Sequence, residues 1–490
     1  MGPFILTIDQ STSGTKVLLI NQKGDIVHKL SVEHEQIYPQ PGWLEHDPIE
    51  IYQNTQRLLH EIVQQQNLSK GDIHAISITN QRETCLLWNK DGQPIQNAIV
   101  WQCNRTAKLC EQYISQGHAP TISEKTGLLI SPYFSATKLQ WLLNAHPQAS
   151  QAYAGTMDSW LIYNLTNKMV HATDYTNACR TLLFNIHTLS WDDQLLDLFN
   201  LKSIILPNVL ESDASFGIVS DPNLPDAIQG TPICGVIGDS QAALFAHGCF
   251  KTGTAKATLG TGSSVLMNIG ENPLPAKNGL VTTIAWKLST KTSYALEGII
   301  YSAADTLSWA KNNLGLFQDY NELMAILKET PSSEGVIIIP AFYGIGAPYW
   351  NVNAKATIYG LSRSSTRSHL LKACSESIAH QIRDVISLLS QETSITLQTL
   401  RCDGGASANQ YLIQDMANFL QLNIHTTNKI DLSPLGASFI CGLALGWWDM
   451  QTIAEKFIIY SNFEPKWDLQ TTQQKQDEWE KIVQNINAYY

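Results

Sequence analysis

Three short loops rich in glycine, serine and threonine could bind an anion; they comprise residues 10–15, 260–262 and 404–406. Each follows an apolar run that predicts a β-strand. Where such a strand ends, free backbone N–H groups and hydroxyls can form a cavity for an anion such as phosphate. Taken alone, each loop is more often an ordinary turn. The Gly-x4-Gly-Lys-Ser/Thr pattern is absent and no Gly-x-Gly-x-x-Gly follows a strand, which disfavours P-loop and dinucleotide-binding folds.

Two aspartates and a lysine accompany these loops. Asp9 ends a predicted strand directly before the first loop, and Asp239 precedes the apolar run 242–245 on the way to the second loop. This arrangement favours a phosphate-binding role for the loops more than any one loop does alone. Asp239 could instead cap a helix, and Asp9 could belong to a turn. Lys16 follows the first loop, where it could face a phosphate or simply be solvated on its strand.

The elements that must position these residues repeat weakly along the chain. Apolar periodicity in the first half predicts strands at 4–8, 16–20, 26–30, 73–79 and 85–88, and helices over 48–66 and 135–144. The second half predicts strands at 254–258, 264–269, 282–286, 292–296 and 399–402, and helices over 301–312, 321–329, 367–391 and 409–420. Each half thus begins with strands around a polar loop and then becomes helical. We therefore expect two α/β domains of similar architecture, 1–248 and 249–490.

Composition excludes several classes of protein. The 490 residues carry only 15% charged residues, 43 acidic and 32 basic, and the formal net charge is −11. An acidic chain without a long Lys/Arg cluster disfavours nucleic-acid binding. The nine cysteines form no Cys-x-x-Cys pair, which favours reduced thiols over a disulfide framework or a zinc site. The sequence has neither a signal peptide nor a run of about 18 apolar residues, so we expect a cytoplasmic protein without membrane insertion.

Longer motifs, in order along nearly the whole chain, resemble the FGGY carbohydrate kinases, most closely those that act on glycerol. They are residues 38–47, 80–84, 97–103, 132–138, 174–178, 238–239, 260–262, 344–350 and 403–405, with 133–142 and 356–376 resembling two family signatures. The resemblance implies two actin-like (ribonuclease H-like) α/β domains with a catalytic cleft between them. It further implies ATP-dependent phosphorylation of a terminal hydroxyl of glycerol or a related small polyol, Mg²⁺ as cofactor, and a homodimer or homotetramer.

The resemblance also assigns roles to individual residues. It implies that Asp239 is the general base and that Asp9 and Asp239 orient Mg²⁺ through water. The implied polyol-binding residues, most of them in the first domain, are Arg82, Glu83, Trp101, Tyr133, Asp239 and Ser240. The implied ATP-binding residues are Thr12, Ser13, Lys16, Thr261, Gly262, Gly405 and Asn409. Without the surrounding motifs, we would interpret Arg82 and Glu83 as a surface ion pair and Trp101 as a residue of the hydrophobic core.

Several positions depart from the family pattern. Ser240 stands where the family usually has Gln, and Ser264 where it usually has Phe. Both changes reduce side-chain volume, which leads to the hypothesis of an enlarged pocket for a tetritol, a pentitol, xylulose or ribulose. Ser11, Ala304 and Ser308 also differ from the usual residues near the nucleotide. The alternative to a glycerol-type kinase is therefore a kinase for a larger sugar alcohol or ketose.

Overall fold

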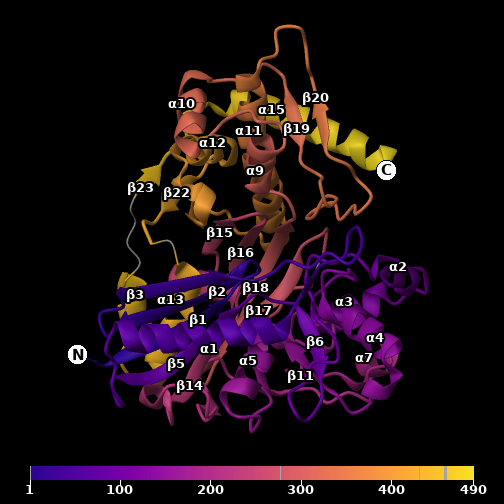
Figure 1. The fold of residues 1–490 in the computed structure, drawn as a ribbon. Coiled ribbons are helices and arrows are strands. Elements are labelled where there is room, and N and C mark those ends of the chain that lie inside the picture. Colours follow the sequence, from indigo (N-terminus) through magenta and orange to yellow (C-terminus); the bar gives the residue numbers. More distant parts are fainter. Residues whose placement is uncertain (1, 276, 430, 457–460) are drawn as a thin grey trace.

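Two large β-sheets form the framework of the structure (Figure 1). The computed structural model describes residues 2–275, 277–429, 431–456 and 461–490. In spatial order, the first sheet consists of β13 (Ser215–Ile218), β14 (Pro232–Gly238), β5 (Ile73–Asn80), β1 (Phe4–Gln10), β2 (Gly14–Asn21) and β3 (Ile26–Glu33). The second consists of β17 (Val281–Leu288), β18 (Lys291–Ile300), β16 (Ser263–Gly270), β15 (Ala255–Leu259), β21 (Thr399–Asp403), β22 (Asn423–Thr426) and β23 (Ser461–Phe463).

The two sheets share one topology. In the first, β2 pairs antiparallel with β1 and β3, and β5 pairs parallel with β1 and β14. In the second, β16 pairs antiparallel with β15 and β18, and β21 pairs parallel with β15 and β22. The repetition expected from the sequence is therefore confirmed, and so is the fold class of two related α/β domains.

The remaining elements lie around these sheets. The helices of the first half are α1 (Pro48–Gln65), α2 (Ala107–Ser115), α3 (Ala119–Thr126), α4 (Ser135–Ala145), α5 (Met157–Leu165), α6 (Tyr175–Ala178), α7 (Asp193–Leu198) and α8 (Asp239–Ala246). Those of the second half are α9 (Asp305–Asn312), α10 (Tyr320–Glu329), α11 (Arg367–Thr393), α12 (Gln410–Leu420), α13 (Leu432–Ala444), α14 (Met450–Lys456) and α15 (Leu469–Tyr489). Within the described residues, no helix combines the length and apolarity needed to span a bilayer.

Short strands complete the architecture. One small sheet has the order β4 (Glu45–His46), β7 (Ala98–Ile99), β6 (Cys85–Trp88) and β8 (Tyr153–Thr156). The two-stranded sheets pair β9 (Ala172–Asp174) with β12 (Asn208–Leu210), β10 (Phe184–Asn185) with β11 (Ser190–Trp191), and β19 (Ile337–Ile339) with β20 (Thr357–Tyr359). The small sheet built around β6 carries the segment that follows Arg82 and Glu83 and so anchors them.

Helices cover both faces of the first sheet. Leu58 and Ile62 of α1 share a buried cluster with Ile8 of β1. On the opposite face Ile5 of the same strand shares a cluster with α8 and with Leu435 of α13. Strand residues alternate between the two faces, so β1 must be apolar on both to be covered in this way. The seven residues of β1 are all buried.

Helix α13 links the two halves of the chain. It comes from the second half but packs against α8 and against β1, β5 and β14 of the first sheet. Ten of its thirteen residues are buried, including Pro434, Phe439 and Ile440. The halves therefore share an apolar core, and the boundary near residue 248 stays a prediction.

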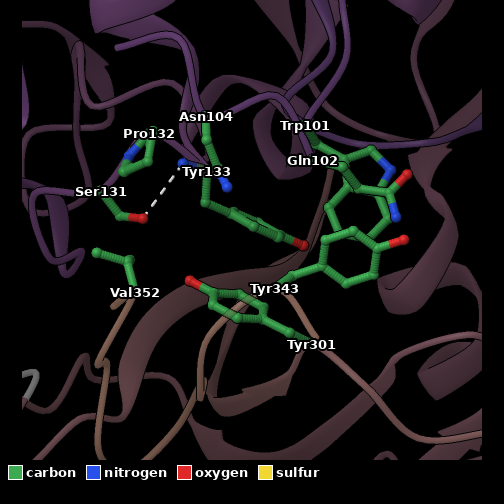
Figure 2. A pocket seen from close by; sticks show the side chains of 9 residues that line it. All are labelled: Trp101, Gln102, Asn104, Ser131, Pro132, Tyr133, Tyr301, Tyr343 and Val352. Carbon is green, nitrogen blue, oxygen red and sulfur yellow. Dashed lines mark hydrogen bonds between the residues drawn. The ribbon is translucent and has the colours of Figure 1, made fainter. Parts of the chain in front are cut away.

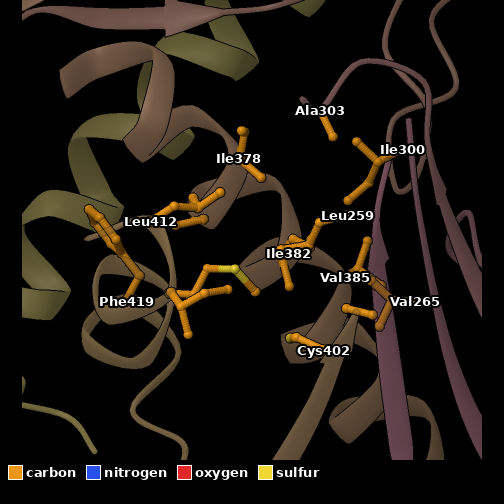
Figure 3. Packing of buried hydrophobic residues seen from close by; sticks show 14 of the residues in the cluster. Leu259, Val265, Ile300, Ala303, Ile378, Ile382, Val385, Cys402, Leu412 and Phe419 are labelled. Carbon is orange, nitrogen blue, oxygen red and sulfur yellow. The ribbon is translucent and has the colours of Figure 1, made fainter. Parts of the chain in front are cut away.

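The second sheet has its own core against α11 and α12 (Figure 3). Ile382 and Val385 of α11 and Leu412 of α12 pack against Leu259 of β15 and Val265 of β16. This packing fixes the end of β15, from which the second glycine-rich loop leaves the sheet. The core therefore holds one wall of the site described below.

One predicted helix begins later than expected. Periodicity placed its start at residue 301, whereas α9 begins at Asp305. The backbone N–H groups of Ala303 and Ala304 instead donate to the carbonyl oxygens of Thr261 and Gly260, at 2.8 and 3.0 Å. The segment before α9 is thus held by the glycine-rich loop of residues 260–262 rather than by helical hydrogen bonds.

Candidate active site

Asp9 and Asp239 lie at the ends of two strands of the first sheet that flank β5. Asp9 is the sixth residue of β1 and pairs with Lys16 of β2. Asp239 follows β14 and is the first residue of α8. Because β1, β5 and β14 run parallel, their carboxyl ends meet at one edge of the sheet. The alternative interpretation of Asp239 as a helix cap is not met, because Gly238 occupies the cap position of α8 and Asp239 is its first residue.

The electrostatic surroundings of Asp9 and Asp239 differ. Burial raises the pKa of Asp9 to about 6; Lys16 opposes this rise, while the charges of Asp239 and Asp431 add to it. Burial also raises the pKa of Asp239, against the opposing charge of Arg82, whose Nε lies 3.4 Å from the carboxylate. Asp239 accepts a hydrogen bond from the backbone N–H of Ser240 at 2.6 Å. A carboxylate with a raised pKa beside a cation is suited to accept a proton.

Arg82 and Glu83 are buried in a network of two guanidinium groups and two carboxylates. Arg82 Nη2 donates to Glu297 Oε1 at 2.7 Å, and Arg180 Nη1 lies 2.7 Å from Glu297 Oε2. Arg180 Nε donates to Glu83 Oε1 at 2.6 Å. Burial opposes the charge on Glu297, but Arg180 and Arg82 outweigh it and lower the pKa to about 2. The interpretation of Arg82 and Glu83 as a surface ion pair is therefore wrong.

Glu83 also has an unusual backbone conformation. Its φ is +62°, in the left-handed region that non-glycine residues rarely adopt. Such strain persists only where surrounding contacts fix it, and it is frequent at functional sites. Here Arg180 holds the side chain, and Ser135 donates its hydroxyl to the carbonyl oxygen of Glu83 at 2.9 Å.

Trp101 and Tyr133 form an aromatic wall in front of this network. Their ring centroids lie 5.3 Å apart in an edge-to-face arrangement, and Tyr301 stacks on Tyr133 at 6.4 Å. Figure 2 shows these side chains around a small pocket to which Tyr343 and Val352 contribute from the second half of the chain. Aromatic faces suit the C–H surface of a polyol or sugar, whereas the neighbouring charged groups suit its hydroxyls.

A cavity of about 460 Å³ lies between the two glycine-rich loops of the second half. Its lining residues include Gly260, Thr261, Ala304, Asp305, Leu307, Ser308, Tyr320, Met324, Gly405, Ala406 and Asn409. Asn409 caps α12 by accepting hydrogen bonds from the N–H groups of Tyr411 and Leu412, while its buried Nδ2 has no partner among the described residues. A buried donor of this kind is available to an acceptor on a ligand or a water molecule in the cavity. The cavity is large enough for a nucleotide.

The structure brings together only part of the predicted nucleotide site. Thr261, Gly405 and Asn409 line the large cavity. Thr12, Ser13 and Lys16 are not among its lining residues; Thr12 Oγ1 accepts a hydrogen bond from Trp101 Nε1 at 2.9 Å, on the side of the aromatic wall. Of the three loops, residues 260–262 and 404–406 thus share one cavity, and residues 10–15 border the aromatic wall.

Gly262 has a steric role. A Cβ at this position would lie 2.6 Å from the carbonyl oxygen of Ile300 and 3.0 Å from that of Tyr301. Only glycine therefore lets the loop approach the end of β18 this closely. Gly405 is different, because a Cβ there would meet no atom within 4 Å and would project into open space.

The two serines that depart from the family pattern have different surroundings. Ser264 Oγ donates to Glu297 Oε1 at 2.6 Å and so joins the charged network. Ser240 is half-buried beside Asp239, to whose carboxylate it donates through its backbone. Ser240 thus lies next to Asp239, which is predicted to bind the polyol, and Ser264 lies next to Glu297, which binds Arg82.

Comparisons with known proteins agree with this geometry. The N-terminal domain of the FGGY family of carbohydrate kinases matches residues 4–246, and the C-terminal domain matches residues 255–445. The glycerol kinase of Pseudothermotoga lettingae is 42% identical over 98% of this chain and 97% of its own, and glycerol kinase 1 of Thermotoga maritima is 42% identical over 99% of each. The chain belongs to the FGGY family of carbohydrate kinases.

Solved structures of carbohydrate kinases share the fold of this chain. Plasmodium falciparum glycerol kinase with ADP superposes with a TM-score of 0.90 at 36% identity, covering 99% of this chain and 98% of that one. Xylulose kinase from Lactobacillus acidophilus has a TM-score of 0.88 at 23% identity, with the same coverage. The protein is therefore an ATP-dependent carbohydrate kinase, as the sequence predicted.

Sequence reasoning missed several residues of this kinase's site. Arg180 and Glu297 complete the charged network, and Asp305 lines the large cavity with a carboxylate whose pKa burial raises to about 6. Glu297 carried a usable signal, because it is the one charged residue in the apolar run 294–300. Charged residues are almost never fully buried unless they are paired. Arg180 stands among small polar residues and carried no comparable signal.

Proposed function

We propose that this kinase transfers the γ-phosphoryl group of ATP to a terminal hydroxyl of glycerol, giving glycerol 3-phosphate and ADP. The observation that carries the proposal is the contact of Asp239 with Arg82, beside the aromatic wall of Trp101 and Tyr133. Relatives that are 42% identical over almost the whole chain are named glycerol kinases, which supports the same substrate.

Each residue of this group has a task in the proposed reaction. Arg82 and Glu83 bind polyol hydroxyls, and Trp101 and Tyr133 cover the C–H face. Asp239 accepts the proton of the attacking hydroxyl, which becomes acidic only as the bond to phosphorus forms. Phosphoryl transfer otherwise depends on alignment and charge neutralisation. The cleft must also exclude water, since water would compete with the polyol for the phosphoryl group.

We propose that Mg²⁺ binds between Asp9 and Asp239 together with phosphate oxygens and water, which is how this ion is usually held. Burial is the main cause of the raised pKa of Asp9, but the charge of Asp239 adds to it, which supports two carboxylates close enough to act on one ion, with Lys16 Nζ 3.4 Å from Asp9. Among the described residues, no group of three or more His, Cys, Asp or Glu side chains could hold a metal ion. Mg²⁺ held there by Asp9 and Asp239 would supply positive charge that offsets the charge of the phosphates.

We propose the predicted residues of the large cavity as the nucleotide site. Thr261 and Gly405 would face the phosphates and the adenosine through their loops, and the free Nδ2 of Asn409 would donate to the nucleotide. Lys16 would contact the phosphates from the first loop after leaving Asp431, whose Oδ1 lies 3.2 Å away. The predicted homodimer or homotetramer and the cytoplasmic location stay predictions.

A second candidate substrate is a longer polyol or ketose. Ser264 is half-buried and held by Glu297, so the space beside the network is not filled by a large side chain at this position. Purified enzyme should be assayed for ADP release with glycerol, dihydroxyacetone, erythritol, threitol, xylulose and ribulose. A kcat/KM highest for glycerol supports the first candidate, and one highest for a four- or five-carbon substrate supports the second.

The substitution Ser264→Phe tests whether this position sets the substrate length. A phenyl ring would fill the space beside Glu297, so we expect kcat/KM for erythritol or xylulose to fall by about tenfold more than that for glycerol, as one lost steric fit implies. Ser364→Phe is the control, because Ser364 is exposed on the surface and should tolerate a phenyl ring. An equal loss on all substrates would contradict the assignment.

A further inference from the structure

Lys256 is a fully buried lysine without an acidic partner in the described part of the chain. It lies in β15, and none of its surface is exposed. Its Nζ donates to Thr258 Oγ1 at 2.8 Å and to the carbonyl oxygen of Ser264 at 3.3 Å, and both acceptors are neutral. Burying an ammonium group without a counter-charge is costly. Two other buried lysines differ from each other: Lys372 Nζ lies 2.8 Å from Asp415, whereas Lys138 Nζ donates to the carbonyl oxygens of Tyr133 and Phe134 and, unlike Lys256, does so away from the glycine-rich loops.

Strand alternation directs Lys256 toward the cleft. Ala255, Ala257 and Leu259 belong to the core of the second half, so Lys256 and Thr258 project from the opposite face of the strand. On that face Thr258 Oγ1 donates to Asp403 Oδ1 at 2.7 Å. Lys256 therefore lies on the side of β15 that faces the reacting groups.

The ammonium group also lies at the base of the second glycine-rich loop, residues 260–262. Its acceptor Thr258 precedes this loop and its acceptor Ser264 follows it. A third bond closes the loop, because Ser263 Oγ donates to the carbonyl oxygen of Thr258 at 2.8 Å. One positive charge is thus fixed under a loop whose Gly260 and Thr261 line the nucleotide cavity.

Acidic groups surround Lys256 at longer range. Burial lowers its pKa, and the charges of Asp403, Glu297 and Asp239 oppose that effect while Arg82 adds to it. The same ammonium group favours the charged form of Asp239, the proposed general base. Lys256 therefore lies between the loop expected to hold the phosphates and the residue expected to accept the proton.

We propose that Lys256 is a further catalytic residue, whose ammonium group contacts the phosphoryl group during transfer. The inference rests on the proposed phosphoryl transfer but not on which polyol is the acceptor. The bond from the γ-phosphorus to the bridging oxygen of ATP breaks, a bond to the polyol oxygen forms, and the polyol proton passes to Asp239. Lys256 keeps its proton and balances the charge on the phosphoryl oxygens, which supplies the missing counter-charge.

The substitution Lys256→Met tests this role. Loss of a preorganised charge at the transferring group should lower kcat about 100-fold. The affinity for a non-hydrolysable ATP analogue should fall about tenfold, as for one charge-assisted contact with the γ-phosphate, and the affinity for ADP, which lacks that phosphate, should not change. Isothermal titration of the full chain with the analogue and with ADP measures both. Lys251→Met, an exposed lysine just before β15, is the matched control and should behave as the wild type.

Two results would overturn the proposal. One is a kcat and an affinity for the ATP analogue within about threefold of the wild type, the scatter expected for a residue away from the chemistry. The other is an equal loss of affinity for the ATP analogue and for ADP, which would show that Lys256 only supports the loop. If Lys256→Met does not fold, Lys256→Arg and Lys256→Gln are compared, and equal turnover in these two would contradict a role of the charge. A wild type that binds ADP but phosphorylates another polyol would reject glycerol as substrate while leaving this proposal intact.

Discussion

Replacing Asp239 by Asn is expected to lower kcat by about 10³- to 10⁴-fold, the upper range for loss of a positioned general base. An amide has the same shape as the carboxylate but cannot accept the proton of the attacking hydroxyl. Arg82 keeps its contacts with Glu297 and Gln241, so its position should be maintained. Polyol affinity and thermal stability should therefore change little. Initial rates of ADP release and a polyol titration measure the two effects separately.

Asp47→Asn is the matched control for this substitution. Asp47 caps α1 by accepting a hydrogen bond from the N–H of Ile49 at 2.8 Å, so it performs the structural role that Asp239 could have had. An Asn also caps helices well. Turnover by Asp47→Asn should match that of the wild type. Turnover by Asp239→Asn within tenfold of the wild type would refute the general-base assignment.

The second large effect is expected for Glu297→Gln, which removes the charge shared by Arg82 and Arg180. Two guanidinium groups would then remain buried: Arg180 would keep Glu83 at 2.6 Å, and Arg82 would keep only Asp239 at 3.4 Å and Glu83 at 4.0 Å. Breaking a buried ion pair on one side costs about 3–5 kcal/mol of the free energy of unfolding. The KM for the polyol should rise as well, because Arg82 loses the partner that orients it. Denaturant unfolding and steady-state kinetics measure the two effects.

The pH dependence of this effect has a definite sign. The folded-state pKa of Glu297 is lowered from its ordinary value of 4.5 to about 2, so its contribution to the free energy of unfolding is complete above pH 4.5 and is lost as the pH falls toward 2. The stability difference between wild type and Glu297→Gln should narrow over that interval. Glu271→Gln is the surface control, because Glu271 forms a solvent-exposed ion pair with Lys291 at 3.1 Å. Its loss should lower the free energy of unfolding by less than about 1 kcal/mol. A Glu297→Gln protein as stable as this control would contradict the account of the network.

Local patterns predicted the framework of the fold well. The apolar runs before Asp9 and after residue 254 identified β1 and β15, because both strands belong to continuous buried cores. The predicted start of α9 was wrong because residues before Asp305 donate backbone hydrogen bonds to Gly260 and Thr261. Periodicity contains no information on such tertiary hydrogen bonds. Likewise, nothing local indicated that α13 would pack on the first sheet.

For the site, too, local patterns identified residues within motifs but not their distant partners. Asp239, Arg82 and Glu83 stand in recognisable motifs, and the structure places Arg82 beside both carboxylates. Arg180 and Glu297 were missed because their partners are far away in the sequence, 97 positions for Arg180 with Glu83 and 215 for Arg82 with Glu297. The scarcity of charge was nonetheless informative, since lone charged residues such as Lys256 and Glu297 stand within apolar strand segments that face the cleft.

The central claim is that this chain phosphorylates a small polyol at the expense of ATP. The most direct test is to incubate the purified protein with ATP, Mg²⁺ and glycerol, and to follow ADP and phosphorylated polyol together. The account predicts glycerol-dependent release of ADP with one glycerol 3-phosphate formed for each ADP. Release of ADP that does not depend on any polyol or sugar, or no release at all from folded protein, would contradict it.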